Sequence, residues 1–527
     1  MNWTTNTLGE MRKITILMAS ILAMVGCAKN SDFDNVSSRN RVEMTISAGQ
    51  ETTEVSRVAF NGGITDMVWE DNDQIKIHIA STGETATFEA FSLSDDRKRA
   101  DFRAEIYEPE TIDSYYAYYP TTTGYNGTNI NFIVPIETST SATTPYMVAS
   151  CENVTMDKVN LEFKPVTALL ELTLGFAAEK VVIEGNNNEY LAGILSYNCA
   201  DGSLTQPAGS KSITLTAPVA GTYYLHVPEV TLSKGYKVTV VKDGAQMIKS
   251  VGYGKEKKFV AGEITPLTIS SFEGISVNLC DVYTTYTLAQ RKNSEANNTA
   301  NTNIIFFNGN CSYTGISSAM VTECGVSCGG TNITANASNK QFSIANQTNK
   351  GQGAYEVYAY IKTVDGKTYT SAKQTVYITG LPYSISFGNT SSPSGWSVSN
   401  TGTKDNGQAS KLFGMKSGEA YAISPRFTLP ANTNVSASFS MSAYTTIAGK
   451  LKPNVYIGAS ESDVKSNLVK QLSSTANYAV TASFSNVATT VVLSSSVGKV
   501  CMHTSGTANN IYGPFTYVKS CTINYAW

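Results

Sequence analysis

The sequence has few of the side chains that most often carry catalysis or bind metals. Only 3 histidines occur among 527 residues, at His78, His226 and His503. Histidine is the side chain whose charge changes near neutral pH and the commonest metal ligand. Because His78 and His226 also lie inside strand patterns, we expect no histidine-based active site and no metal centre, and the sequence predicts no cofactor.

Charge is also scarce. Charged residues make up 15% of the chain, the formal net charge is -3, and no basic stripe is present, so the sequence does not predict nucleic-acid binding. Tyrosine and glycine are plentiful instead, at 29 and 40 residues, together with long Ser/Thr/Asn runs. This composition is typical of all-β surface or secreted proteins, and the length predicts several domains.

The amino-terminal segment has the pattern of an export signal. An apolar run from Ile14 to Val25 follows two basic residues and is too short to span a bilayer as a mature helix. We expect translation to begin at Met11. Residues 24–27 resemble a bacterial lipobox, which implies that 1–26 is removed and that Cys27 is acylated, so that the membrane is a partner through a lipid anchor and 27–41 forms a tether. The alternative is ordinary cleavage with Cys27 as a plain residue.

Eight cysteines remain once Cys27 is set aside, an even number in an exported chain, so disulfides are permitted. Four fall in one region, two in another and two in the front half: Cys280, Cys311, Cys324 and Cys328; Cys501 and Cys521; Cys151 and Cys199. The first group allows three pairings. Free buried thiols are the alternative.

Near the start of the mature chain, a strand and a loop suggest a mechanism. In Val42–Ala48, apolar and polar residues alternate with the period of a half-buried strand, and the pattern returns in Ile75–Ile79. The polar tract between these strands leads to Arg57. A single cleavage there would free the first strand, and an empty sheet edge is a docking site for a strand from another molecule.

Four short motifs carry a resemblance in the front half: SRVAFNG (56–62), WEDNDQI (69–75), YYLHVP (223–228) and FVAGE (259–263). Their order resembles the fimbrillin-like (Mfa-like) family of Bacteroides-type bacteria over about Val42 to Ile269. The resemblance implies two fimbrillin-like domains, 42–158 and 159–269. It also implies a location at the outer membrane or cell surface, or in a fimbrium.

The same resemblance implies strand exchange with other pilus subunits. In the family, a trypsin-like protease cuts the lipidated precursor after an arginine in the loop that follows the first strand, and a partner's strand replaces that strand. Arg57 stands where this loop is expected, whereas cleavage at Arg39 or Arg41 would leave the first strand in place. The alternative is that Arg57 is an ordinary solvated residue of a lipid-anchored monomer.

Residues 270–382 predict a third domain. Apolar and polar positions alternate through Tyr355–Ile361, and Asp365-Gly366 predicts a tight hairpin before the return strand. This segment resembles a fibronectin type III or immunoglobulin-like module, which implies a spacer. Gly325–Gly329 fits the G-x-S-x-G pattern of a nucleophile elbow, but poor helix formers follow it, so we expect no catalysis.

Residues 383–527 resemble a galactose-binding-like jelly roll, which implies a carbohydrate-binding domain. A sugar ring offers an apolar face ringed by hydroxyls, which suits an exposed aromatic side chain. Five aromatic residues are candidates for glycan contact, with core positions as the alternative: Trp396, Tyr444, Tyr456, Tyr512 and Tyr517. The only helix predicted in this domain is short, from Ser460 to Leu472.

Together the patterns predict an all-β chain of tandem β-sandwich domains that is not an enzyme. The predicted function is a surface lipoprotein, a pilus tip or accessory subunit or adhesin assembled by strand exchange after cleavage near Arg57. The tip assignment follows from the two domains beyond Ile269, because a subunit that accepts a strand but offers none can only cap a filament. The alternative is a non-polymerising surface lipoprotein that binds a glycan or a host-surface ligand through its C-terminal domain.

Overall fold

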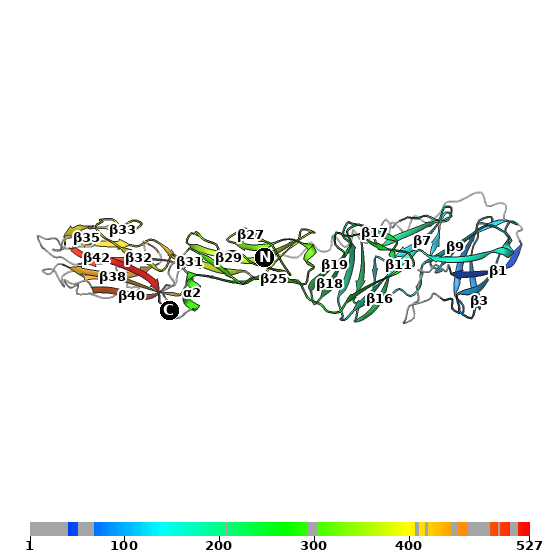
Figure 1. Ribbon diagram of the computed structural model, residues 1–527, viewed down its shortest axis with the longest axis horizontal. Helices are drawn as coiled ribbons and strands as arrows, with labels where there is room; N and C mark the ends of the chain where they lie inside the picture. The colour runs from blue at the N-terminus through cyan, green and yellow to red at the C-terminus, as the bar shows by residue number, and fades with distance from the viewer. Residues whose placement is uncertain are drawn as a thin grey trace, which may run out of the picture.

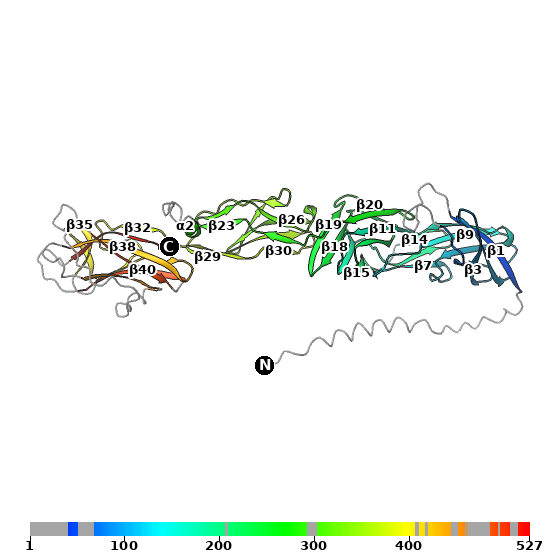
Figure 2. The ribbon, with the colours of Figure 1, turned by 90° about the horizontal axis from the view of Figure 1, so that it is seen from below.

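The computed structural model is a row of β units along one long axis, with β1 near one end and β35 near the other (Figures 1 and 2). It describes residues 40–50, 68–205, 209–291, 303–405, 411–416, 420–443, 452–458, 460, 485–493, 496–505 and 515–526. Nearly all of the elements in these ranges are strands, which confirms the all-β prediction. No helix among the described residues is long and apolar enough to cross a membrane.

The first unit is a closed barrel of seven strands in the order β1-β10-β9-β5-β2-β3-β4. Its strands are β1 (Arg41–Gln50), β2 (Gln74–Ile79), β3 (Thr85–Leu93), β4 (Arg99–Tyr107), β5 (Asp113–Tyr119), β9 (Met147–Val154) and β10 (Asn160–Pro165), with a 3-10 turn η1 (Met156–Lys158). Trp69 is 1% exposed and lies at the centre of the core, with Phe102, Tyr119 and Phe163 edge-on around it. Closing the sheet buries one face of each strand and leaves no free edge.

The second unit is built from several smaller sheets around one large apolar cluster. Its strands are β6 (Gly124–Tyr125), β7 (Asn129–Val134), β8 (Glu137–Thr138), β11 (Thr167–Leu174), β12 (Lys180–Gly185), β13 (Gly193–Asn198), β14 (Leu204–Thr205), β15 (Ser212–Thr216), β16 (Gly221–Pro228), β17 (Val230–Leu232), β18 (Tyr236–Lys242), β19 (Ala245–Val251), β20 (Lys257–Phe259) and β21 (Ile264–Ile269).

The boundary predicted at 158/159 does not divide these two units cleanly. Strands β6, β7 and β8 precede residue 158, yet β7 pairs with β13 and β8 pairs with β15 in the second unit. The chain leaves the barrel after β5 and returns to it as β9 and β10. Periodicity identifies a strand but not the sheet that it joins, so the sequence pattern could not reveal this crossing.

The third unit begins after residue 270 and forms three small sheets over one core. Its strands are β22 (Ser276–Asn278), β23 (Asp281–Thr284), β24 (Ile305–Asn308), β25 (Cys311–Thr314), β26 (Val321–Cys328), β27 (Thr331–Ala335), β28 (Gln341–Phe342), β29 (Gly353–Thr363), β30 (Thr368–Thr370) and β31 (Gln374–Ile378), with a 3-10 turn η2 (Ser318–Met320). The predicted hairpin is present, since β29 pairs with β30 and Gly366 takes the positive φ of 80° that its turn requires.

The fourth unit is a sandwich of two sheets, one built around β42 and the other around β41. Its strands are β32 (Tyr383–Ser386), β33 (Ser397–Ser399), β34 (Thr401–Asp405), β35 (Lys411–Lys416), β36 (Ala420–Ile423), β37 (Phe427–Thr428), β38 (Thr433–Ala443), β39 (Lys452–Gly458), β40 (Ser485–Leu493), β41 (Val497–Ser505) and β42 (Phe515–Tyr525). Of the helix predicted over 460–472, only Ser460 falls within the described residues.

One α-helix was not predicted. Helix α2 (Thr285–Arg291) follows β23 in the sequence and lies where the third unit meets the fourth (Figure 1). Its Tyr286 packs in the core of the fourth unit. The Tyr286 ring lies 5.2 Å from that of Tyr525 in an edge-on arrangement. Seven residues are too few for a helical period to stand out from a strand pattern, and the helix is stabilised by this packing.

Candidate functional site

The candidate site is the position of β1 in the barrel. Strand β1 pairs antiparallel with β4, from Arg41 opposite Tyr107 to Gly49 opposite Arg99, and parallel with β10 near its end. The prediction that Val42–Ala48 is a strand in a sheet is confirmed. Because β1 lies between two partners, its removal would leave a slot with two unpaired edges, one on β4 and one on β10.

Three side chains of β1 point into the core. Met44, Ile46 and Ala48 are 1%, 2% and 0% exposed and belong to the same cluster as Trp69, whereas Thr45 between them is exposed. Full burial of a side chain such as isoleucine or methionine contributes about 1.5–3 kcal/mol. A strand that replaced β1 would therefore need apolar side chains at the same alternate positions.

An ion pair crosses over the end of β1. Arg99 on β4 pairs with Glu162 on β10, and Arg99 Nη1 also donates to Asn160 Oδ1 at 3.1 Å. Gly49 of β1 lies beneath this pair, and a Cβ there would come within 2.9 Å of Arg99 Cζ. Because Gly49 has no side chain, it leaves room for Arg99 of β4 and Glu162 of β10 to pair across β1. The side chains of Arg99 and Glu162 are 49% and 39% exposed, so the pair contributes only about 0.2–1 kcal/mol.

The other end of β1 is also held by an arginine. Arg41 Nη2 lies 3.4 Å from Glu84 Oε1, and the guanidinium carbon lies 5.0 Å from the centre of the Tyr107 ring. These contacts are exposed and weak. Strand β1 is therefore held mainly by its ladder hydrogen bonds and by its three buried side chains.

The slot has a defined length. Beyond β10 the chain continues as β11. On the side where β10 pairs with β1, β11 pairs with β21 in parallel, from Leu169 opposite Ile264. The turn before β21 is tied to β11 by the Gly262 amide, which donates to the Thr167 carbonyl at 3.0 Å. A strand occupying the slot thus has about the length of β1, which is 10 residues.

The residues predicted for processing and glycan contact are only partly within the described chain. Cys27, Arg57, Tyr444 and Tyr512 lie outside the described residues. Trp396, Tyr456 and Tyr517 are 6%, 5% and 0% exposed. An exposed ring face is needed for stacking on a sugar, so the structure contradicts this role for these three residues and assigns them to the core.

Trp396 illustrates why the sequence could not separate the two roles. Its ring packs edge-on against Phe387 at 5.1 Å, and its Nε1 donates to Tyr383 Oη at 2.9 Å. Both the apolar face and the polar group are therefore used inside the protein. An aromatic residue in a strand has the same sequence pattern whether its ring faces the core or a ligand.

Two other motifs have structural roles. Ser327 of the G-x-S-x-G segment is 1% exposed in β26, which turns into strand β27 rather than into a helix, so the geometry of a nucleophile elbow is missing there. Asp73 accepts hydrogen bonds from the Glu70 amide and the Tyr119 hydroxyl, and burial raises its pKa. Among the described residues no group of three metal-ligating side chains occurs.

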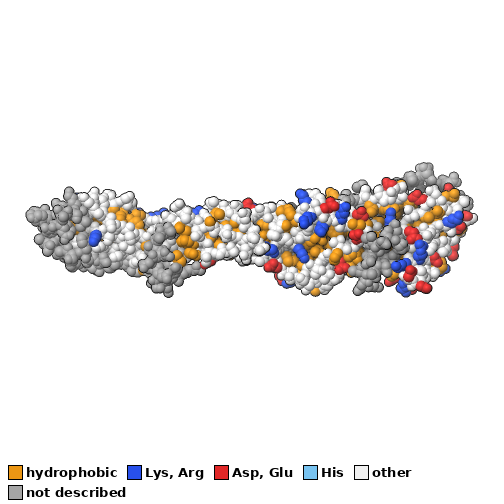
Figure 3. Space-filling view, viewed as in Figure 1, with side chains coloured by type: hydrophobic (Ala, Val, Ile, Leu, Met, Phe, Trp, Pro, Cys, Tyr) orange, Lys and Arg blue, Asp and Glu red, His pale blue; other side chains and the backbone are white. Residues whose placement is uncertain are grey.

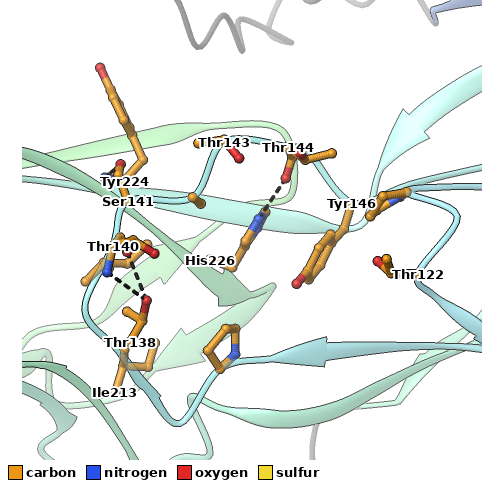
Figure 4. A pocket seen from close by; sticks show the side chains of 14 residues that line it. Thr122, Thr138, Thr140, Ser141, Thr143, Thr144, Tyr146, Ile213, Tyr224 and His226 are labelled. Atoms are coloured by element: carbon orange, nitrogen blue, oxygen red, sulfur yellow. Dashed lines mark hydrogen bonds between the residues drawn. The ribbon is translucent and has the colours of Figure 1, made fainter. Parts of the chain in front are cut away.

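A cavity of about 360 Å³ lies near the junction of the first two units (Figure 4). Its lining contains many hydroxyl groups and no Asp, Glu, Lys or Arg: Pro120, Thr122, Pro135, Thr138, Thr140, Ser141, Ala142, Thr143, Thr144, Tyr146, Ile213, Tyr224, Leu225 and His226. Such a lining suits a small neutral group with hydroxyls rather than an ion. No sequence pattern predicts this cavity, because its lining comes from several separate segments.

His226 is the one titratable imidazole of this cavity, and it is held neutral. Its ring stacks on Tyr146 at 4.0 Å, and its Nε2 donates to the Thr144 carbonyl at 3.0 Å. Because a carbonyl can only accept, Nδ1 is the acceptor, and the Thr167 hydroxyl donates to it at 2.9 Å. Burial lowers the pKa of His226 to about 4, so it offers no proton for acid catalysis near neutral pH.

This burial predicts an acid sensitivity. The pKa of His226 is about 6.5 in an unfolded chain and about 4 in the fold. The free energy of unfolding therefore has its full value with respect to His226 above pH 6.5, and it decreases as the pH falls from 6.5 to 4. The total loss is about 3 kcal/mol. We expect chemical denaturation at pH 7 and pH 4.5 to show a smaller loss of stability for His226→Gln than for the unchanged protein. Equal losses for both proteins would contradict the neutral assignment.

The front half of the chain is similar to a known protein family. Residues 56–274 match the model of the fimbrillin-like family, which confirms the resemblance seen in the sequence motifs. No curated protein is significantly similar to the chain in sequence.

Several solved structures resemble parts of the chain at low identity. A Bacteroides ovatus protein assigned to cell adhesion is 13% identical, with 44% of this chain and 92% of that chain covered and a TM-score of 0.31. The C-terminal carbohydrate-binding module of the laminarinase LamC from Zobellia galactanivorans is 11% identical, with 27% and 99% covered and a TM-score of 0.18. The fibronectin(III)-like modules of CbhA from Clostridium thermocellum are 11% identical, with 47% and 91% covered and a TM-score of 0.14. At these scores the likenesses carry no argument about function.

Proposed function

We propose, from the fimbrillin-like character of residues 56–274, that this protein is a surface fimbrial or adhesin-type subunit that accepts a partner's strand in place of β1. The observation that carries the proposal is that β1 completes a closed barrel between β4 and β10. A strand in that position is covalently joined to the rest of the barrel only through the segment before β2. One cleavage in that segment leaves β1 held by noncovalent contacts alone.

Arg57 is the proposed cleavage site. It is the only lysine or arginine between Gln50 and Gln74, so a trypsin-like protease has one target between the two strands. Cleavage after Arg41, at the first residue of β1, would leave the rest of the strand in the barrel. Acylation at Cys27 would hold the uncut precursor at the outer membrane, and cleavage at Arg57 would release it from that anchor.

The proposed position in a fimbrium is the tip or an accessory site. Strand β42 is paired with β38 on one side and with β35 and β32 on the other. Unlike β1, β42 is not proposed to be released by a cleavage, so it stays in the sheet of its own unit. The third and fourth units extend away from the strand-accepting barrel, in a row that suits a stalk and a head (Figure 1).

The surface of the rod supports a division of roles between its two ends. On the face shown in Figure 3, charged side chains gather on the first two units, whereas the described parts of the third and fourth units show few of them. Charge on the first two units suits subunits that must find one another in solution, because complementary charges raise association rates. A surface with few charges, as on this face of the outer units, suits contact with a neutral ligand.

Limited digestion with a trypsin-like protease tests the processing step. We expect the folded protein to be cut first after Arg57, with the rest of the chain remaining intact. The Arg57→Ala variant should resist this first cut, and Arg41→Ala serves as the matched control that is still cut. A first cut elsewhere, or equal cleavage of Arg57→Ala, would contradict the proposed processing.

A second candidate function is glycan capture by a protein that does not polymerise. The observation that favours it is the uncharged, hydroxyl-lined cavity beside His226, since the three described aromatic candidates in the fourth unit are buried. The same digestion separates the two functions. Resistance at Arg57 together with glycan-array binding would favour capture, and cleavage followed by uptake of a strand would favour the subunit.

A further inference from the structure

Two of the four clustered cysteines of the third unit lie in direct contact. The Cys280 amide donates to Cys311 Sγ at 3.3 Å. Cys280 follows β22 and Cys311 begins β25, and these strands pair with Asn278 opposite Ser312. Both thiols are buried in the same apolar cluster, so neighbouring strands of one sheet hold them together.

Two other candidate pairs within the described chain are poorly placed for a bond. Cys324 and Cys328 are four residues apart on the extended strand β26, which separates them by about 13 Å, too far for a disulfide. Cys324 Sγ instead contacts the Ala335 carbonyl at 3.1 Å. Cys501 and Cys521 belong to different sheets and different apolar clusters.

We propose that Cys280 and Cys311 form a disulfide in the exported protein. The sequence left three pairings open for the four cysteines of this region, and the contact selects one that includes these two. The proposal rests on the surface location proposed above, because thiols persist in the cytosol and are oxidised outside it. It does not depend on strand exchange.

The chemistry requires a disulfide-bearing oxidant, such as an oxidoreductase of the export compartment. The Cys311 thiolate attacks one sulfur of that oxidant, which releases its first thiol and forms a mixed disulfide. The Cys280 thiolate then attacks the Cys311 sulfur, which forms the internal bond and releases the second thiol. The two cysteines lose two protons and two electrons, and the oxidant's disulfide becomes two thiols.

The order of attack follows from the contact between the thiols. The hydrogen bond from Cys280 lowers the pKa of Cys311 to about 7, whereas the same bond and burial raise the pKa of Cys280. Cys311 is therefore the more readily ionised of the two thiols. Because it is 0% exposed in the fold, the oxidant must reach it before the third unit has closed, and Cys280 follows as the resolving thiol.

The bridge would secure the joint between the third and fourth units. The segment between the two cysteines contains α2, whose Tyr286 packs against Tyr525 and lies with its hydroxyl 3.4 Å from Thr433 Oγ1 in the fourth unit. A disulfide between Cys280 and Cys311 would close a covalent loop that contains α2. A force that pulls the fourth unit away from the third would then act on this covalent loop rather than on the short pairing of β22 with β25.

Peptide mapping tests the proposal directly. The mature chain is exported or folded in the presence of glutathione disulfide, its free thiols are alkylated in denaturant, and it is digested with trypsin and a glutamate-specific protease. Cleavage after Glu273, Arg291, Glu295 and Glu323 places Cys280 in peptide 274–291 and Cys311 alone in peptide 296–323. We expect these two peptides to be joined and to separate on reduction.

A stability measurement provides an independent check. Reduction should lower the unfolding midpoint of the oxidised protein by about 5 °C or more, because the closed loop holds about 30 residues. The double variant Cys280→Ser, Cys311→Ser should show no such shift, and the control Cys199→Ser should keep it. Alkylation of both Cys280 and Cys311 in the oxidised protein, or a link from Cys311 to Cys324, would overturn the proposal even if the double variant fails to fold.

Discussion

Replacing Ile46 is expected to destabilise the barrel more than any other single change in β1. Ile46 is 2% exposed, and it belongs to the apolar cluster around Trp69. Ile46→Ala removes buried methyl groups and leaves a cavity, which costs about 2–5 kcal/mol. Ile46→Asp places an unpaired carboxylate in the same position, and we expect it to prevent the barrel from closing.

A neighbouring position supplies the matched control. Thr45 is exposed on β1 and lies opposite Arg103 of β4, so Thr45→Asp places its charge in water beside a cation. We expect a change within about 0.5 kcal/mol for this variant. Unfolding in denaturant, followed by the fluorescence of Trp69 in variants that lack the other tryptophans, measures both. An effect of Ile46→Ala as small as that of Thr45→Asp would show that β1 contributes little to the core.

The sequence predicted the strands of the candidate site well because their patterns are local. The alternation from Val42 to Ala48 and from Ile75 to Ile79 follows from one buried face, and the structure buries Met44, Ile46, Ile75, Ile77 and Ile79 as expected. Trp69 belongs to the same buried cluster, as the size of its apolar ring favours. In each case the side chain's period or size decides its environment without reference to distant parts of the chain.

The features that could not be predicted depend on contacts between distant segments. The sequence suggested an edge left by β1, but it could not show that β4 and β10 flank it on both sides, since β10 lies more than a hundred residues away. The ion pair over Gly49 has the same origin. The three described aromatic candidates of the fourth unit failed as a site prediction for the same reason, because burial of a residue such as Tyr517 depends on the strands packed around β42.

Exchange of β1 after cleavage is the second large effect that we expect. Once the chain is cut after Arg57, β1 is held by its ladder, by its buried side chains and by two exposed arginine contacts. Each exposed contact is worth at most about 1 kcal/mol. Arg99→Ala should therefore speed the release of β1 while leaving the stability of the uncut barrel nearly unchanged.

A strand that competes with β1 must fill the same three buried positions in the barrel core. A peptide with the sequence of Arg41–Gln50 places methionine, isoleucine and alanine at the three buried positions, whereas the same peptide with aspartate in place of Ile46 buries a charge. We expect the second peptide to bind at least about a hundredfold more weakly, since a difference of 1.4 kcal/mol changes a binding constant tenfold.

Native mass spectrometry of the cleaved protein tests the central claim most directly. The protein cut after Arg57 is mixed with an excess of the isotopically labelled Arg41–Gln50 peptide, and the mass of the complex is followed over time. We predict that the labelled peptide replaces the original amino-terminal fragment one for one and that the barrel stays folded, while the aspartate peptide does not enter. Retention of the original fragment with no uptake of label, or collapse of the barrel when that fragment leaves, would contradict strand replacement.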